Sequence, residues 1–159
     1  MADMDGRTGT ASNPFDPDIP YSERSLAIAC TRGRQAVVSH FHTMLTEVNL
    51  TEQQWRVLRV LNDFEPVALS AICDYCCIHK VSMTRIIRAL SERGLVTRER
   101  NSEDLRAYNI RLTPEGRAFL DELTPRANAV SRSIVERFGL EKSAQLIKLL
   151  KELATLRGE

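Results

Sequence analysis

The feature that most constrains this fold is a stripe of apolar residues at helical spacing, followed at once by two short strands. The stripe recurs at intervals of three and four residues and consists of Met83, Ile86, Ile87 and Leu90. It predicts a helix over residues 80–93, which Gly94 ends because glycine accepts a left-handed backbone. Residues 95–100 and 108–113 follow as strands, the second with alternating apolar and polar residues. With a further helix over 66–77, this order is typical of a winged helix-turn-helix.

Upstream of this unit, the chain begins with a polar segment and continues as helix. Residues 1–20 hold three prolines and four aspartates without periodicity, so we expect a disordered or loosely docked acidic tail. A helical pattern then runs over residues 22–48, with Ser22 as its expected N-cap. Thr51 and Gln54 form a capping-box pattern that opens a short helix ending near residue 63. Pro66 suits the first turn of the 66–77 helix.

Downstream, two further helices are expected. Thr113 and Pro114 are a cap and a first-turn proline for a helix to about residue 137, which Pro125 should kink or interrupt. A last helix is expected over 141–156. A winged-helix head cannot cover the leucine stripe of this last helix or the apolar stripe of residues 26–48. A second copy of the chain is therefore the expected partner, and packing inside the monomer is the alternative.

These patterns predict a mainly α fold, a winged helix-turn-helix with N- and C-terminal helices that form a dimerisation region. The expected parts are the tail 1–20, the helical dimerisation region 21–50 and 114–159, and the DNA-binding domain 51–113.

The formal net charge of +1, taken alone, argues against a nucleic-acid partner, but it is an average over segments of opposite charge. Residues 79–111 hold eight basic and four acidic side chains, an excess of +4, whereas the tail 1–20 carries −3. Seven of the eight bases are arginine, which suits bidentate contacts with phosphates and bases. The alternative is a solvated helix face. On a helix-turn-helix pattern, however, Val81, Ser82, Arg85 and Arg88 fall on the outer face of the second helix, where base edges are contacted.

Four segments of the sequence resemble the MarR family of transcription regulators: residues 50–58 (LTEQQWRVL), 91–96 (SERGLV), 104–106 (DLR) and 112–116 (LTPEG). The likeness spans about residues 24–157, and the LTEQQWR run is most similar to the HpaR-type repressors of homoprotocatechuate (4-hydroxyphenylacetate) degradation. The resemblance implies a homodimer that represses transcription from a pseudo-palindromic operator in double-stranded DNA. A cytoplasmic location is expected because the sequence has neither a recognisable secretory signal nor a membrane-spanning run.

The resemblance also implies a role for the wing, where an arginine enters the minor groove and an aspartate orients it. Asp104 and Arg106 stand at those positions, and Ala107 replaces a further arginine often found there. The DNA-binding residues predicted from pattern and resemblance together are Lys80, Val81, Ser82, Thr84, Arg85, Arg88, Arg98, Arg100, Asp104 and Arg106.

Members of the family release DNA when a small phenolic or aromatic acid binds, so a cation, hydrogen-bond donors and an apolar wall are expected. The residues predicted for that role are Ser25, Arg34, His40 and Trp55. Three of these have an alternative role: Arg34 in an ion pair between subunits, His40 as a helix cap, and Trp55 as plain core.

The four cysteines leave two other interpretations open. Cys73 and Cys76 share an apolar helix face, which favours core packing. A metal site is disfavoured because no second pair of ligands lies nearby. Cys30 and Cys77 are the candidates for a thiol-based redox-sensing repressor. A winged-helix protein-interaction module is a further alternative. No catalytic motif, cofactor motif or membrane-spanning run is recognisable, so neither an enzyme nor a membrane protein is expected.

Overall fold

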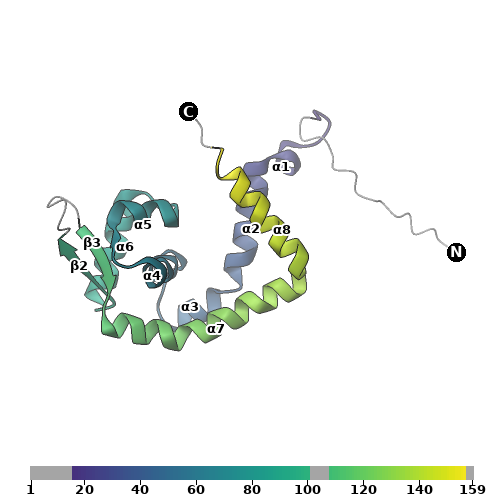
Figure 1. Ribbon diagram of the computed structural model, residues 1–159. Helices are drawn as coiled ribbons and strands as arrows, with labels where there is room; N and C mark the ends of the chain where they lie inside the picture. The colour runs from purple at the N-terminus through teal and green to yellow at the C-terminus, as the bar shows by residue number, and fades with distance from the viewer. Residues whose placement is uncertain (1–15, 101–107, 157–159) are drawn as a thin grey trace. The chain divides into compact units, whose positions relative to one another are not determined.

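The structure is a computed structural model that describes residues 16–100 and 108–156, and the chain divides into two compact units, 1–39 and 40–159. Figure 1 labels the helices and strands along the chain. The first unit contains α1 (Tyr21–Arg24) and α2 (Leu26–Ser39).

The prediction of one continuous helix over residues 22–48 is wrong, because the chain forms three helices there. Ser25 separates α1 from α2 with an extended backbone, ψ 118°. Its Oγ accepts a hydrogen bond from the Ile28 backbone N–H at 3.4 Å, so Ser25 caps α2, and Ser22 lies inside α1. A turn at residues 40–41 ends the helical run a second time before α3 begins. Serine competes for backbone donors in this way, which is why it favours helix starts over helix interiors.

The second unit contains a winged helix-turn-helix, which confirms the predicted fold class. Its elements follow in the order α3 (His42–Glu47), α4 (Glu52–Phe64), β1 (Val67–Ala68), α5 (Leu69–Cys76), α6 (Lys80–Glu92), β2 (Val96–Arg100) and β3 (Tyr108–Leu112). The capping box at the start of α4 is present. The Gln54 N–H donates to Thr51 Oγ1 at 3.1 Å, and the Thr51 N–H donates to Gln54 Oε1 at 2.9 Å.

The sheet has one strand more than predicted. Its antiparallel order is β1-β3-β2, and β1 pairs Val67 with Ile110 and Ala68 with Asn109. Pro66 therefore precedes a strand, and the prediction that it begins a helix over 66–77 is wrong, since α5 starts at Leu69. The two-residue strand is stabilised by its pairing with β3 and by burial of Val67, neither of which is visible in local sequence.

One hydrophobic core joins α3, α4, α5, α6 and the sheet to α7 (Pro114–Phe138), which contributes buried residues as far as Ala127. Its largest fully buried side chains are Leu58, Leu61, Ile72, Met83, Ile87, Leu90, Ile110 and Leu120. Full burial of a side chain of this size stabilises the fold by about 1.5–3 kcal/mol. The core therefore fixes α6 against α4 and the sheet, with the opposite face of α6 outward.

Helix α7 begins as predicted and runs for 25 residues with Pro125 inside it, so of the two predicted effects of this proline, a kink or an interruption, the interruption does not occur. Thr113 Oγ1 accepts from the Gly116 N–H at 2.9 Å and donates to the Gly94 carbonyl at 2.6 Å. This cap ties the start of α7 to the end of α6, beside the sheet (Figure 1).

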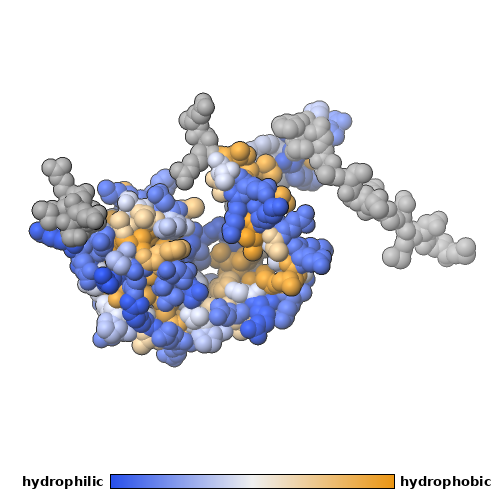
Figure 2. All heavy atoms as spheres, viewed as in Figure 1, coloured by the Kyte–Doolittle hydropathy of each residue, from blue (hydrophilic) through white to orange (hydrophobic). Residues whose placement is uncertain are grey.

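Helix α8 (Leu140–Leu153) has no buried residue. Large apolar side chains on and beside it are exposed, namely Phe138, Leu140, Leu146, Ile147, Leu149, Leu150 and Leu156. Figure 2 shows hydrophobic side chains gathered over α8. Within residues 16–100 and 108–156, no helix combines the length and the hydropathy needed to cross a bilayer.

Candidate nucleic-acid interface

Helix α6 separates its side chains cleanly between core and solvent. Met83, Ile86, Ile87 and Leu90 are buried, as their spacing predicts. The outer face is exposed at every predicted position, which comprises Lys80, Val81, Ser82, Thr84, Arg85 and Arg88. Val81, with 70% of its surface exposed, has no role in the core of the described chain. An apolar side chain at the start of this face suits contact with a thymine methyl group.

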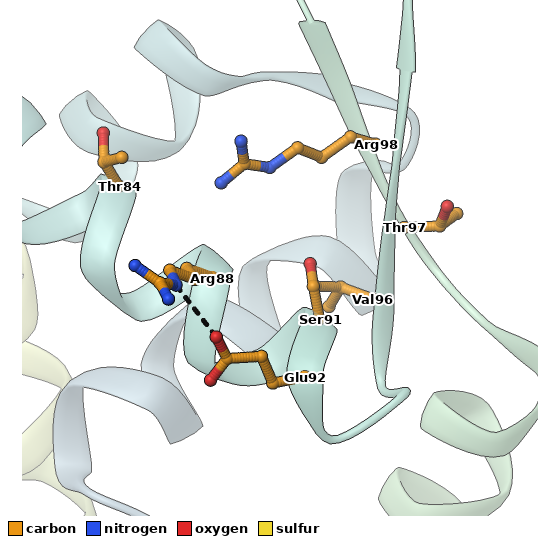
Figure 3. Close-up of a pocket in the computed structure, with 7 residues that line it drawn as sticks. All are labelled: Thr84, Arg88, Ser91, Glu92, Val96, Thr97 and Arg98. Carbon is orange, nitrogen blue, oxygen red and sulfur yellow. Dashed lines mark hydrogen bonds and ion pairs between the residues drawn. The ribbon is translucent and has the colours of Figure 1, made fainter.

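A groove of about 550 Å³ lies between the outer face of α6 and strand β2. Its lining, drawn in Figure 3, consists of Thr84, Arg88, Ser91, Glu92, Val96, Thr97 and Arg98. The Arg98 side chain extends from β2 toward α6 across this groove (Figure 3). Hydroxyl donors and guanidinium groups together suit the phosphate oxygens of a nucleic-acid backbone.

An ion pair within the groove lowers its positive charge. Arg88 Nε lies 2.8 Å from Glu92 Oε1, one helical turn away, and both side chains are more than half exposed. A solvated pair of this kind stabilises a helix by only about 0.3–0.5 kcal/mol, so a phosphate can compete with Glu92 for the guanidinium. Arg85, Arg98 and Arg100 are exposed as well, and no ion pair links Arg85 or Arg98 to another described residue.

Two of the arginines counted in the basic segment have structural roles instead. Arg93 donates from Nη1 to the Asn49 carbonyl at 2.8 Å and from Nη2 to the Val48 carbonyl at 3.1 Å, and it lies over the Phe119 ring. Arg111 Nε lies 2.9 Å from Glu99 Oε2 on the neighbouring strand. The interface therefore has fewer available cations than the charge count suggests, because pairing across elements is invisible in composition.

The wing residues Asp104 and Arg106 lie outside the described residues. Arg98 and Arg100, both exposed on β2, lead into that segment. Their predicted role in DNA binding, like that of Asp104 and Arg106, stays a prediction.

The residues predicted for ligand binding are divided between the two units. Ser25 and Arg34 belong to the first unit, where Ser25 caps α2 and Arg34 is exposed. In the second unit, His40 is exposed and lines a cavity of about 270 Å³ with Ile134, Arg137 and Phe138. Trp55 is about nine-tenths buried within the hydrophobic core, in agreement with the simpler alternative for this residue.

Arg59 is a further candidate, which is absent from the residues predicted above. Its guanidinium carbon lies 5.7 Å from the centre of the Trp55 ring, and Nη1 donates to Thr124 Oγ1 on α7 at 3.1 Å. The spacing of four residues from Trp55 on one helix could have indicated it, since such residues are neighbours on a helix surface. Together Trp55 and Arg59 place an aromatic wall beside a fixed cation.

The cysteines divide into protected and accessible thiols. Cys76 is fully buried, and burial raises the pKa of its thiol to about 11. Burial, followed by the charge of Asp74, raises the pKa of Cys73 as well. Core packing is therefore confirmed for Cys76, whereas Cys30 and Cys77 are exposed. Among the described residues, no three His, Cys, Asp or Glu side chains converge in a way that could hold a metal ion.

Comparisons with known proteins agree with this architecture. The MarR family pattern matches residues 50–108. The homoprotocatechuate degradative operon repressor of Escherichia coli is 35% identical over 132 residues, which cover 83% of this chain and 89% of that protein. The HTH-type transcriptional regulator FarR of Neisseria gonorrhoeae is 33% identical, with 83% of this chain and 90% of FarR covered.

Among solved structures, the crystal structure of NadR in complex with 4-hydroxyphenylacetate is 32% identical, with a TM-score of 0.76 over 84% of this chain and 94% of NadR. These relatives are transcription regulators and not enzymes. The chain exposes an arginine-bearing helix on a winged helix-turn-helix, and its relatives match it over most of its length. The chain therefore belongs to the MarR family of transcription regulators.

Proposed function

We propose that this protein is a dimeric repressor that binds a pseudo-palindromic operator in double-stranded DNA and releases it when a small aromatic acid binds. The observation that carries the DNA-binding part is the outer face of α6. It exposes Lys80, Arg85 and Arg88 while the opposite face is buried, and Arg98 extends toward it from β2. In this proposal α6 enters the major groove and Arg106 the minor groove, with Asp104 orienting it.

The dimeric part of the proposal follows from α8. Its exposed leucines form an apolar surface that nothing in the described chain buries, and a second copy of the same helix is the simplest cover. We assign residues 21–50 and 114–159 to dimerisation and 51–113 to DNA binding. Two heads in a symmetric dimer would contact two half-sites about one helical turn apart. A cytoplasmic location is part of the same proposal.

The effector part follows from Trp55, Arg59 and the likeness to NadR. An aromatic carboxylate needs an apolar wall and a cation, which these two side chains of α4 supply at a ring-to-guanidinium distance of 5.7 Å. We retain Ser25, Arg34 and His40 as further candidates. 4-Hydroxyphenylacetate is the compound to test first, because the NadR structure, at 32% identity, contains it.

The decisive experiment is a gel shift on the DNA upstream of the gene that encodes this chain, with Arg106→Ala as the test variant. We expect the variant to bind at least about tenfold more weakly, which corresponds to about 1.4 kcal/mol. Arg132→Ala is the matched control. Arg132 is exposed on α7, and its replacement removes the same charge from a position outside the head. Unchanged binding by folded Arg106→Ala would refute the wing assignment.

Titration of 4-hydroxyphenylacetate and other aromatic acids into the same assay tests the effector. A second candidate function, a redox-sensing repressor, rests on the exposed thiols of Cys30 and Cys77. Insensitivity to every acid, together with release by peroxide, would favour that candidate. Binding that lacks a steep salt dependence would instead favour a protein-interaction module.

A further inference from the structure

The turn between α5 and α6 begins at a buried helix end. Helix α5 ends in a Schellman motif, in which the Cys77 N–H donates to the Asp74 carbonyl at 3.2 Å and the Ile78 N–H to the Cys73 carbonyl at 3.0 Å. Cys77 adopts the left-handed conformation, φ 49° and ψ 49°, that this motif requires. These two bonds satisfy carbonyls inside the last turn of α5.

The carbonyl of Cys76, the last residue of α5, finds its partner on α4. Arg56 Nη1 donates to this oxygen at 2.7 Å, and Arg56 Nη2 lies 3.2 Å from Glu52 Oε2, which holds the guanidinium in place. Cys76 has no exposed surface, so little water can replace a lost partner. A carbonyl at a helix end that loses its partner in such a place is costly, and a bond from a charged donor is stronger than a neutral one.

Three residues, 77–79, separate this carbonyl from the start of α6, and the His79 carbonyl accepts the first bond of that helix from the Met83 N–H at 2.9 Å. The turn is thus too short to isolate α6 from a shift at Cys76. We propose that Arg56 is a positioning residue for DNA recognition. It holds the α5–α6 turn against α4 and thereby sets where the first residues of α6 present their side chains. This inference rests on the proposed DNA-binding function.

The same contact links two parts of that proposed function. Trp55 and Arg59, the candidate wall and cation for an effector, lie on α4 beside Arg56. A movement of α4 caused by an effector would reach the turn before α6 through the Arg56 guanidinium. The coupling needs no separate communicating segment, since one helix carries both contacts.

The test compares Arg56→Met, which keeps an unbranched stem but has no donor, with Arg56→Lys, which keeps the charge and a donor group but lacks the two-nitrogen fork of arginine. Two quantities are measured on the full-length protein. One is the affinity for the upstream DNA fragment in a gel shift. The other is the rate at which a thiol reagent labels Cys76 in the native state, resolved by peptide mass spectrometry.

For Arg56→Met, we expect DNA binding weaker by about tenfold or more, because a charged hydrogen bond at the turn is lost. Cys76 labelling should be faster because the turn opens more often, although loss of the Arg56 charge raises the pKa of this thiol and opposes part of the gain. Arg56→Lys should recover part of both. Labelling does not involve DNA. A wild-type protein that fails to bind the fragment would refute the proposed function and with it the role of Arg56 in recognition, and the labelling rates would still decide whether Arg56 holds the turn.

The control is Leu123→Ala, which removes a buried side chain of α7 and so destabilises the same core. The denaturant concentration is adjusted until this variant and Arg56→Met have the same free energy of unfolding. We expect this control to label Cys76 more slowly than Arg56→Met and to bind DNA within about twofold of wild type. Equal effects from both variants would reduce Arg56 to a general stabiliser and overturn the proposal. So would wild-type labelling in Arg56→Met, or no recovery in Arg56→Lys.

Discussion

Replacement of Gly116 by alanine tests how closely α7 packs on the turn after α6. A Cβ atom at Gly116 would lie 2.1 Å from the Leu95 carbonyl oxygen and 3.0 Å from its carbonyl carbon. Real Cβ contacts are not this short, and the neighbour is backbone, which cannot rotate away. The start of α7 must therefore move by about 1 Å or more to restore an ordinary van der Waals contact.

The cost follows from the bonds that such a movement would stretch. Thr113 donates from its backbone N–H to the Leu95 carbonyl at 3.1 Å and from Oγ1 to the Gly94 carbonyl at 2.6 Å, and its Oγ1 also caps Gly116. At about 1 kcal/mol for each of the three bonds, the loss is about 3 kcal/mol. Alanine returns about 1 kcal/mol through its higher helix propensity. The net destabilisation is about 2 kcal/mol, or roughly 4–8 °C in melting temperature for a chain of this size.

The assay is chemical denaturation of both proteins at equal protomer concentration, since dimerisation would otherwise contribute to the comparison. Gly33→Ala is the matched control, because Gly33 lies inside α2 and, apart from its chain neighbours and the surrounding backbone of α2, no described residue comes within 4 Å of the added methyl group. That variant should be neutral or more stable by up to about 1 kcal/mol. A Gly116→Ala protein as stable as wild type would show that α7 does not approach Leu95 so closely.

Three further predictions concern charge, thiols and assembly. Glu92→Gln frees Arg88 and removes a carboxylate from the groove, so a gel shift should show DNA binding stronger by about twofold to fivefold. Burial raises the pKa of Cys76 from its ordinary value of 9.0 to about 11, so the unfolded chain loses this proton first, and the free energy of unfolding should fall as the pH rises from about 9 to about 11. Below pH 9 both states keep the proton, and Cys76 should contribute no pH dependence. Replacement of Leu146 and Leu150 together by glutamate should convert the proposed dimer to monomer in light scattering, because charges would enter the apolar face of α8.

Each of these has its own control. Glu136→Gln removes an exposed carboxylate of α7 and should leave DNA binding unchanged; an equal gain there would reduce the Glu92 effect to net charge. In Cys76→Ala the free energy of unfolding should no longer show the fall between about pH 9 and about pH 11 that is assigned to Cys76. A fall as steep as in the wild type would assign it to other groups. Lys151→Glu adds charge to an exposed position of α8, and dissociation by that variant would contradict the assignment of the interface to the leucines.

Local sequence determined most of the fold, because the elements of the head carry their own signals. The stripe from Met83 to Leu90 predicts α6 and its buried face, the Thr51–Gln54 pair predicts the start of α4, and Thr113 predicts the start of α7. Apolar periodicity and side-chain caps act within a few residues, so they can be identified without knowledge of the tertiary structure. The exposed face of α6 followed from the same periodicity.

The predictions from local sequence are wrong where a distant partner or a competing hydrogen bond determines the backbone conformation. Ser25 caps α2 and breaks an otherwise helical run, and β1 exists because Val67 pairs with Ile110 more than forty residues away. Pro125 lies inside α7 in spite of its low helix propensity, since packing can outweigh propensity.

At the candidate interface, the sequence by itself determined which arginines stand on the basic segment, and tertiary structure decided which of them are available. Arg93 satisfies carbonyls of the turn after α3, and Arg111 pairs with Glu99 across the sheet. The bond from Arg56 to Cys76 spans twenty residues and two helices. Composition records the number of charges, whereas their partners depend on distances of about 3 Å that only the folded chain creates.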